Sequence, residues 1–269
     1  MLPPASHSRL NPDSLLAILA TLYDGPVGRF RVGLPPKDET VERDNQGTTD
    51  TQRERGDLGT AKTRAGYDAV ADEYAARFVD ELAAKPLDRA LLGLFAEVVR
   101  GRGLVADVGC GPGHVASYLH GCNVPVVGID LSPAMVDAAR RLHPDLTFQL
   151  GSLLALDAGD GAWGGIVAFY SVIHLSPEAV PQALAEFHRV LRPGGRLLLA
   201  YHIGDEVRHF AEWWGHAVDL DFHFFATNDL VRWLEAAGFV VEARVEREPY
   251  TPKEVATQRG YLLARKPGE

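Results

Sequence analysis

Three closely spaced glycines, Gly109, Gly111 and Gly113, and the aspartate Asp130 are the residues best suited to bind a small molecule. The glycines directly follow a short apolar run, residues 104–108, and precede a segment with helical spacing. A short apolar run that ends at glycines is typical of a buried parallel strand. Because glycine has no Cβ, the backbone of the turn can approach a ligand closely. The pattern predicts a nucleotide-type site between a strand and a helix.

Asp130 ends the next predicted strand, residues 124–130. An ionised carboxylate accepts two hydrogen bonds in a fixed fork, so an acid about twenty residues beyond the glycine loop can bind two ribose hydroxyls. The alternative is an acid that interacts with the dipole of the following helix. Ser132 and Pro133 are better suited to begin that helix, so we assign Asp130 to a ribose.

The spacing of the glycines distinguishes two kinds of nucleotide site. The dinucleotide pattern G-x-G-x-x-G requires a glycine at position 114, where this chain has His114. The string Asp107-Val108-Gly109-Cys110-Gly111-Pro112-Gly113 instead resembles motif I of the class I S-adenosylmethionine (SAM)-dependent methyltransferases. The resemblance covers about residues 63–267 and implies SAM as the cofactor. A dinucleotide site and a purely structural turn are the alternatives.

The same resemblance implies which residues contact the cofactor. In the family, the glycine loop passes the methionine part of SAM, and residues after the second and third strands lie near the adenine. The implied cofactor-binding residues are Tyr67, Tyr74, Asp107, Gly109, Cys110, Gly111, Gly113, Asp130, Leu131, Met135, Ser152, Leu153 and Tyr170. The family usually carries an acid where this chain has Ser152, so the serine hydroxyl or the backbone is expected to contact the adenine.

Tyr67 and Tyr74 belong to a segment with helical spacing, residues 67–78. Seven residues make nearly two helical turns, so both side chains can face the same side. The segment resembles the N-terminal helix that closes over the cofactor in many small-molecule methyltransferases, where tyrosines contact the methionine carboxylate and the sulfonium. The alternative is an amphipathic helix whose aromatic side chains fill the core.

His174 and His202 are the candidates for acid–base catalysis. They follow or end the predicted fourth and fifth strands, residues 165–170 and 196–202, and such folds bind ligands at the carboxyl ends of their strands. Methyl transfer from a sulfonium depends on alignment and needs no metal, so none is expected. A hydroxyl acceptor requires a base, and histidine is suited to that task because its ordinary pKa is near neutrality.

Residues 204–226 interrupt the alternation of strands and helices and are rich in aromatic side chains. In the family, the region after the fifth strand covers the substrate, so we expect a lid that suits an apolar or aromatic acceptor. A satellite core is the alternative. His209, His216 and His223 are seven residues apart and could share a helical face; a metal site there is disfavoured by the spacing.

The alternation of strands and helices predicts a Rossmann-like α/β domain over residues 63–269, with a doubly wound, mostly parallel seven-stranded sheet and helices on both faces. The resemblance implies that the last strand, residues 260–265, is antiparallel, unlike in dinucleotide-binding folds. Residues 1–62 are predicted to be an N-terminal extension, with one possible short helix over residues 11–23. Residues 35–60 have almost no apolar side chains and are predicted to be disordered.

Composition limits the partners. The formal net charge of −9 disfavours a nucleic-acid backbone as the main partner, because phosphate binding needs clustered Lys and Arg. No apolar run is long enough to span a bilayer. Two cysteines, Cys110 and Cys122, fit a reducing cytosol, so we expect a cytoplasmic protein. The oligomeric state is left open.

The sequence therefore predicts a methyltransferase that transfers a methyl group from SAM to a small, apolar or aromatic molecule by in-line displacement, with O- or N-methylation favoured. Another SAM-using reaction on the same scaffold is one alternative. A SAM-binding sensor or scaffold without turnover is a second. A nicotinamide-dependent oxidoreductase is a third, should the glycine loop bind a dinucleotide.

Overall fold

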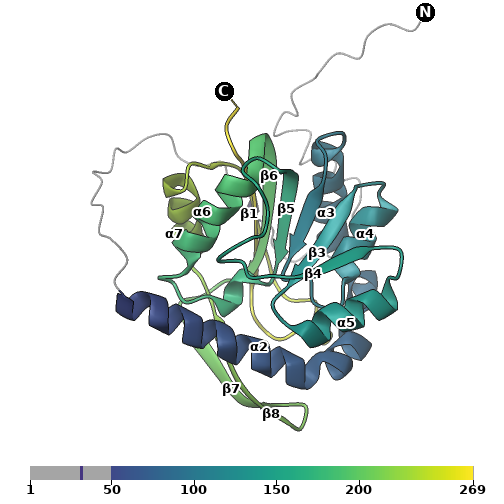
Figure 1. Ribbon diagram of the computed structural model, residues 1–269, viewed down its shortest axis with the longest axis vertical. Helices are drawn as coiled ribbons and strands as arrows, with labels where there is room; N and C mark the ends of the chain where they lie inside the picture. The colour runs from purple at the N-terminus through teal and green to yellow at the C-terminus, as the bar shows by residue number, and fades with distance from the viewer. Residues whose placement is uncertain (1–30, 33–49, 269) are drawn as a thin grey trace, which may run out of the picture.

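A computed structural model describes residues 31–32 and 50–268, with side chains from residue 59 onward. Its main sheet has eight strands in the order β1-β9-β10-β6-β5-β2-β3-β4 (Figure 1). These strands are β1 (Arg31–Val32), β2 (Val105–Val108), β3 (Val126–Asp130), β4 (Thr147–Leu150), β5 (Trp163–Phe169), β6 (Leu191–His202), β9 (Val240–Arg247) and β10 (Arg259–Arg265).

Helices cover both faces of the sheet, and α2 crosses one end of it (Figure 1). The described helices are α2 (Asp50–Phe78), α3 (Pro86–Val99), α4 (His114–Gly121), α5 (Pro133–Leu142), α6 (Val180–Val190) and α7 (Thr227–Ala236), with short 3-10 helices η1 (Glu81–Ala84) and η2 (Val172–His174). None of these helices is long and apolar enough to cross a bilayer.

The strand directions confirm the predicted fold class. Strands β6, β5, β2, β3 and β4 are parallel to one another. Strand β10 lies between β6 and β9 and runs antiparallel to both. The seven strands β2–β6, β9 and β10 therefore form the predicted mostly parallel sheet, and the short β1 adds an eighth strand beside β9.

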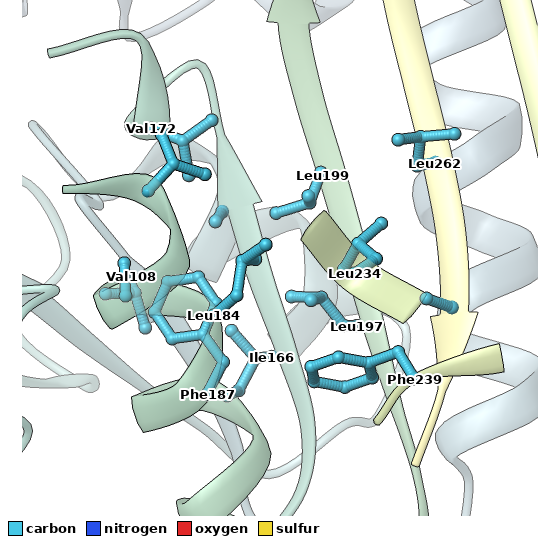
Figure 2. Packing of buried hydrophobic residues seen from close by; sticks show 14 of the residues in the cluster. Val108, Ile166, Val172, Leu184, Phe187, Leu197, Leu199, Leu234, Phe239 and Leu262 are labelled. Atoms are coloured by element: carbon cyan, nitrogen blue, oxygen red, sulfur yellow. The ribbon is translucent and has the colours of Figure 1, made fainter. Parts of the chain in front are cut away.

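The core consists of two apolar layers, one on each face of the sheet. Successive strand residues point to opposite faces, so Leu197 of β6 joins one layer and Leu198 joins the other. The first layer packs against α6 and α7 through Phe187 and Leu234 (Figure 2). The second packs against α3, α4 and α5. Both layers hold the carboxyl ends of the central strands in fixed positions.

The prediction of disorder up to residue 60 was wrong for residues 50–60. Helix α2 begins at Asp50 and crosses the predicted boundary at residue 62. Composition could not reveal this helix, because α2 is held by contacts with α5 and β8 rather than by a broad apolar face of its own. The short helix considered over residues 11–23 lies outside the described residues.

The segment after β6 is a β-hairpin made of β7 (Val207–Trp213) and β8 (His216–His223). The idea that His209, His216 and His223 share a helical face was therefore wrong. Trp214 and Gly215 connect the strands with φ of 52° and 83°, the backbone that a tight two-residue hairpin turn requires. Among the described residues, no group of three or more His, Cys, Asp or Glu side chains is placed to hold a metal ion.

Candidate cofactor site

A cavity that is partly open to solvent lies at the carboxyl ends of β3 and β5 beside the glycine loop. Helix α2 forms the opposite wall, and the segment after β5 closes one end. Parallel α/β sheets bind ligands at this edge because the loops that follow the strands converge there. The strand order thus brings together side chains that are more than one hundred residues apart in sequence, such as Thr60 and Leu175.

Ten of the thirteen predicted cofactor residues line this cavity. They are Tyr67, Tyr74, Gly109, Cys110, Gly111, Asp130, Leu131, Ser152, Leu153 and Tyr170. The other three lie behind its wall: Asp107 and Met135 are each 1% exposed, and Gly113 is the N-cap of α4. A direct contact with a ligand in the cavity is therefore not expected for Asp107, Gly113 or Met135.

The glycine loop and Asp130 form one hydrogen-bonded unit. The backbone N–H of Gly111 donates to Oδ2 of Asp130 at 2.8 Å, and the N–H of Ser132 donates to Oδ1 at 2.9 Å. Burial raises the pKa of Asp130, while these backbone hydrogen bonds act in the opposite direction. Each carboxylate oxygen retains a further lone pair for a ligand hydroxyl.

Gly109 needs to be glycine for two reasons. Its φ is 75°, in the left-handed region that side chains disfavour. A Cβ at this position would also lie 2.2 Å from Cβ of Ser171. At Gly111 the nearest atom to an added Cβ would be Cε1 of Tyr74 at 3.8 Å, so space remains there. Gly109 therefore allows close packing, whereas Gly111 faces the open cavity.

Asp107 is buried in strand β2, two residues before the glycine loop. It is fully buried, and its Oδ2 atom accepts no hydrogen bond from any described residue. Burial raises its pKa to about 7, although His114 and the backbone of Ala116 act to lower it. A carboxyl group of this kind is held near its midpoint of ionisation at neutral pH.

Two serine hydroxyls leave hydrogen-bonding capacity at the cavity wall. The hydroxyl of Ser171 is buried and makes no hydrogen bond to any described residue. Oγ of Ser152 accepts the N–H of Leu154 at 3.2 Å, so its own proton is left to donate. A carboxylate, a glycine-rich loop and two hydroxyls are groups that fit SAM, which presents a ribose, an adenine and a charged amino-acid end.

Tyr67 and His174 meet across the cavity. The hydroxyl of Tyr67 lies 2.7 Å from Nε2 of His174, and Nδ1 of His174 lies 3.2 Å from the carbonyl oxygen of Asp221. A carbonyl oxygen only accepts, so Nδ1 carries the proton and Nε2 accepts the proton of Tyr67. Desolvation lowers the pKa of His174 to about 4, which keeps the ring neutral near pH 7.

Aromatic side chains of α2 and the β7–β8 hairpin form a cap beside the cavity. The ring of Tyr74 lies 5.7 Å from Tyr67 and 5.8 Å from Trp213, both edge to face. Trp213 stacks on Trp214 at 4.4 Å. Edge-to-face and stacked pairs of this kind hold two elements together beyond the area they bury. These ring contacts join helix α2 to the hairpin formed by β7 and β8.

His202 does not line the cavity, so the structure does not support the prediction that it is catalytic. Its Nδ1 atom is hydrogen-bonded to Oγ1 of Thr257 at 2.9 Å, and its ring stacks on Phe224 at 5.1 Å. Strand β6 extends to His202 and pairs there with Arg259 of β10. This pairing draws the side chain into a packed region, where desolvation lowers its pKa to about 3.

Several cavity residues were missed by the sequence analysis. They are Thr60, Thr63, Arg64, Pro112, His114, Ser132, Phe169, Ser171 and Leu175. The first three had a detectable signal, because with Tyr67 they follow the i, i+3, i+4, i+7 spacing of one helical face. This helical spacing was not recognised because the segment around residue 60 was expected to be disordered. Ser171 carried no signal, because its importance comes from its fit against Gly109.

Comparison with known proteins identifies a methyltransferase domain. A family model described as "Methyltransferase domain" matches residues 105–195, from β2 into the turn at the start of β6. A demethylmenaquinone methyltransferase of Beutenbergia cavernae is 30% identical over 157 residues, 58% of this chain and 57% of that protein. An uncharacterized 37.1 kDa protein in transposon TN4556 of Streptomyces fradiae is 32% identical over 206 residues, 72% of this chain and 57% of that protein. The chain thus spans little more than half the length of these relatives.

Solved structures share the fold. The 1,6-didemethyltoxoflavin-N1-methyltransferase of Burkholderia thailandensis, solved with S-adenosylhomocysteine, has a TM-score of 0.61 at 22% identity, over 86% of this chain and 94% of that one. The magnesium protoporphyrin IX methyltransferase of Synechocystis, solved with SAM, has a TM-score of 0.60 at 16% identity. The match covers 77% of this chain and 97% of that one. Residues 105–195 thus match a methyltransferase domain, and the chain shares the fold of solved SAM-dependent methyltransferases, including the antiparallel β10.

Proposed function

We propose that this protein binds SAM and transfers its methyl group to a small molecule. The observation that carries the proposal is the carboxylate of Asp130, which is fixed by the N–H of Gly111 in the cavity wall. A carboxylate at the end of a parallel strand such as β3, next to a glycine loop, is suited to bind two vicinal ribose hydroxyls. When bound, SAM supplies a methyl group on a positively charged sulfur.

The described residues divide the remaining binding tasks. The backbone of Gly109 and Gly111 leaves room for the methionine part, and the hydroxyl of Ser171 is available to its amino-acid end. Leu131 and Ser152 line the part of the cavity next to Asp130 and would hold the adenine. Methyl transfer depends mainly on alignment and on exclusion of water, which the rings of α2 and the hairpin provide.

The acceptor is proposed to be an apolar or aromatic small molecule that is methylated on oxygen or nitrogen. The cavity is lined by the rings of Tyr67, Tyr74 and Phe169 beside a small number of polar groups, as small-molecule sites are. Its lining includes Tyr67, His174 and Leu175, which suit such an acceptor. Relatives named for menaquinone and didemethyltoxoflavin methylation act on small molecules of this kind. Cys110 and Cys122 are both free, so we also place the protein in a reducing compartment.

Two measurements test the proposal. Calorimetry should show binding of SAM and of S-adenosylhomocysteine (SAH) to the purified chain in a one-to-one ratio. SAM with a tritiated methyl group, incubated with a panel of phenols, carboxylic acids, amines and thiols, should label at least one compound. Absence of SAM binding would reject the proposal. Binding without transfer to any compound of the panel would instead favour a sensor or scaffold.

A further inference from the structure

We propose that Tyr67 and His174 form a proton relay that deprotonates the methyl acceptor, and that the acceptor group is therefore a hydroxyl. The inference rests on the proposed methyl transfer and adds a chemical class of substrate to it. Tyr67 changes from a cofactor ligand, as the family resemblance implied, to a group that contacts the reacting oxygen. The two side chains come from α2 and η2, which are 107 residues apart in sequence.

The directions of its hydrogen bonds leave the hydroxyl of Tyr67 able only to accept a hydrogen bond from a ligand. Its single proton is donated to Nε2 of His174 over 2.7 Å, because Nδ1 of His174 donates to the carbonyl of Asp221. The phenolic oxygen can then only accept from a ligand. The methionine carboxylate has no proton to donate, so it does not match this oxygen. A group that carries a proton, such as a hydroxyl, does match it.

The pair lies where a reacting group must come. Both side chains line the same cavity as the glycine loop and Asp130. The ring of Phe222 lies 4.8 Å from the ring of His174, and that of Trp213 lies 6.0 Å from the ring of Tyr67. These rings pack against the half-buried pair. A hydrogen-bonded pair held between such rings can pass a proton in a defined direction.

The proton balance is simple. The acceptor hydroxyl gives its proton to Oη of Tyr67, and the phenolic proton of Tyr67 moves to Nε2 of His174. The acceptor oxygen forms the new bond to the methyl carbon as the carbon–sulfur bond breaks, and the electron pair of that bond stays on sulfur. One positive charge disappears from sulfur and one appears on the imidazole. The cavity therefore keeps its total charge, and the proton later leaves His174 to water.

The charged and titratable surroundings keep both groups of the relay neutral at rest. Desolvation raises the pKa of Tyr67, with smaller contributions from Tyr74 and Asp130. Desolvation lowers the pKa of His174, to which His223 contributes slightly. Tyrosine and imidazole are thus both neutral at rest, so Nε2 keeps its lone pair at neutral pH. Proton transfer becomes favourable only while the positive charge on sulfur is being lost.

The first test needs no acceptor. Nitrogen-15 NMR of the SAH complex should show His174 with its proton on Nδ1 and with Nε2 accepting a hydrogen bond. The Tyr67→Phe variant should shift the Nε2 resonance of His174, and Tyr118→Phe, which removes a hydroxyl bonded to the carbonyl of Arg89, should not. A proton on Nε2, or an unchanged resonance in Tyr67→Phe, would overturn the relay.

The second test uses the compounds labelled in the tritium assay. These compounds should be hydroxyl acceptors. For them, Tyr67→Phe and His174→Gln should each lower kcat by roughly 100-fold, the usual loss when a general base is removed. The dissociation constant of SAH should change by less than about twofold, and His120→Gln on the exposed end of α4 should leave kcat unchanged.

The outcomes distinguish this inference from the proposed function. Loss of SAH binding in Tyr67→Phe would show that Tyr67 holds the cofactor, which would overturn the relay but not methyl transfer. Labelling of thiols alone, or of tertiary amines, would overturn the acceptor class. Within a series of phenols, the loss caused by Tyr67→Phe should shrink as the phenol becomes more acidic, because a phenol already ionised needs no base. A loss independent of phenol acidity would contradict the relay.

Discussion

The backbone N–H of Gly111 donates a hydrogen bond to Oδ2 of Asp130 over 2.8 Å, across nineteen residues of sequence. This bond joins the turn after β2 to the end of β3, so the glycine loop and the carboxylate of Asp130 are positioned together. It also orients the carboxylate, whose second oxygen accepts the N–H of Ser132. The two parts of the proposed cofactor site therefore form one hydrogen-bonded unit.

Replacing Asp130 by asparagine should weaken SAH binding. The amide preserves the shape but removes the negative charge, and hydrogen bonds to charged groups contribute about 1.5–3 kcal/mol, which is roughly 10- to 100-fold in affinity. Calorimetry measures the change. Asp137→Asn, at an exposed aspartate of α5, is the matched control and should bind SAH normally. Equal affinity in both variants would remove Asp130 from the site.

The two glycines of the loop should respond differently to alanine. Gly109→Ala places a Cβ 2.2 Å from Ser171 and a side chain at a φ of 75°, so unfolding free energy should fall by about 2 kcal/mol or more. In Gly111→Ala the added Cβ meets no close atom, so the free energy of unfolding should fall by only about 1 kcal/mol. The main effect of this variant should be weaker SAM binding. Urea denaturation and calorimetry separate the two effects. Equal loss of stability in both variants would contradict the packing described here.

Helix α2 offers a test of its contact with the hairpin. A Cβ on Gly66 would lie 2.7 Å from Cγ of Leu220 in β8, whereas nothing lies within 4 Å of a Cβ on Gly59 of the same helix. Gly59→Ala should stabilise the helix by about 0.5–1 kcal/mol. Gly66→Leu should displace the hairpin and shift the tryptophan fluorescence of Trp213 and Trp214 to longer wavelength. An unchanged spectrum would show that α2 and β8 are not packed together.

Local patterns predicted the parts of the site that depend on backbone conformation. The glycines, the carboxylate at the end of β3 and the tyrosines on one helical face were found because turn, strand and helix geometry fix their relative positions. The family resemblance implied an antiparallel last strand, and β10 is antiparallel as expected. These features depend on short stretches of sequence, so they are visible without tertiary structure.

The remaining features depend on contacts between distant segments. His174 lies in the cavity and His202 does not, although both follow or end strands, because β10 and Phe224 enclose the second ring. The hairpin after β6 was missed because its turn, Trp214–Gly215, is a weak signal within an aromatic-rich segment. The start of α2 was missed because residues 50–60 have almost no apolar side chains, a composition typical of disorder.

The enclosed ring of His202 should make stability depend on pH. Desolvation lowers its pKa to about 3 from an ordinary value of 6.5, so below pH 6.5 the unfolded chain binds a proton that the folded chain does not. The stability that depends on neutral His202 is therefore complete above pH 6.5 and is lost as pH falls. His202→Gln should reduce the slope of unfolding free energy against pH, between pH 4 and 6, by about 1.4 kcal/mol per pH unit. Urea midpoints across this range measure the slope, and identical slopes would show that His202 is not enclosed.

Titration of SAH into the purified chain by calorimetry tests the central claim most directly. We expect one SAH bound per chain, with an affinity that falls roughly 10- to 100-fold in Asp130→Asn and is unchanged in Asp137→Asn. No heat of binding in the wild-type chain, confirmed to be folded by circular dichroism, would contradict the account of this cavity as a SAM site.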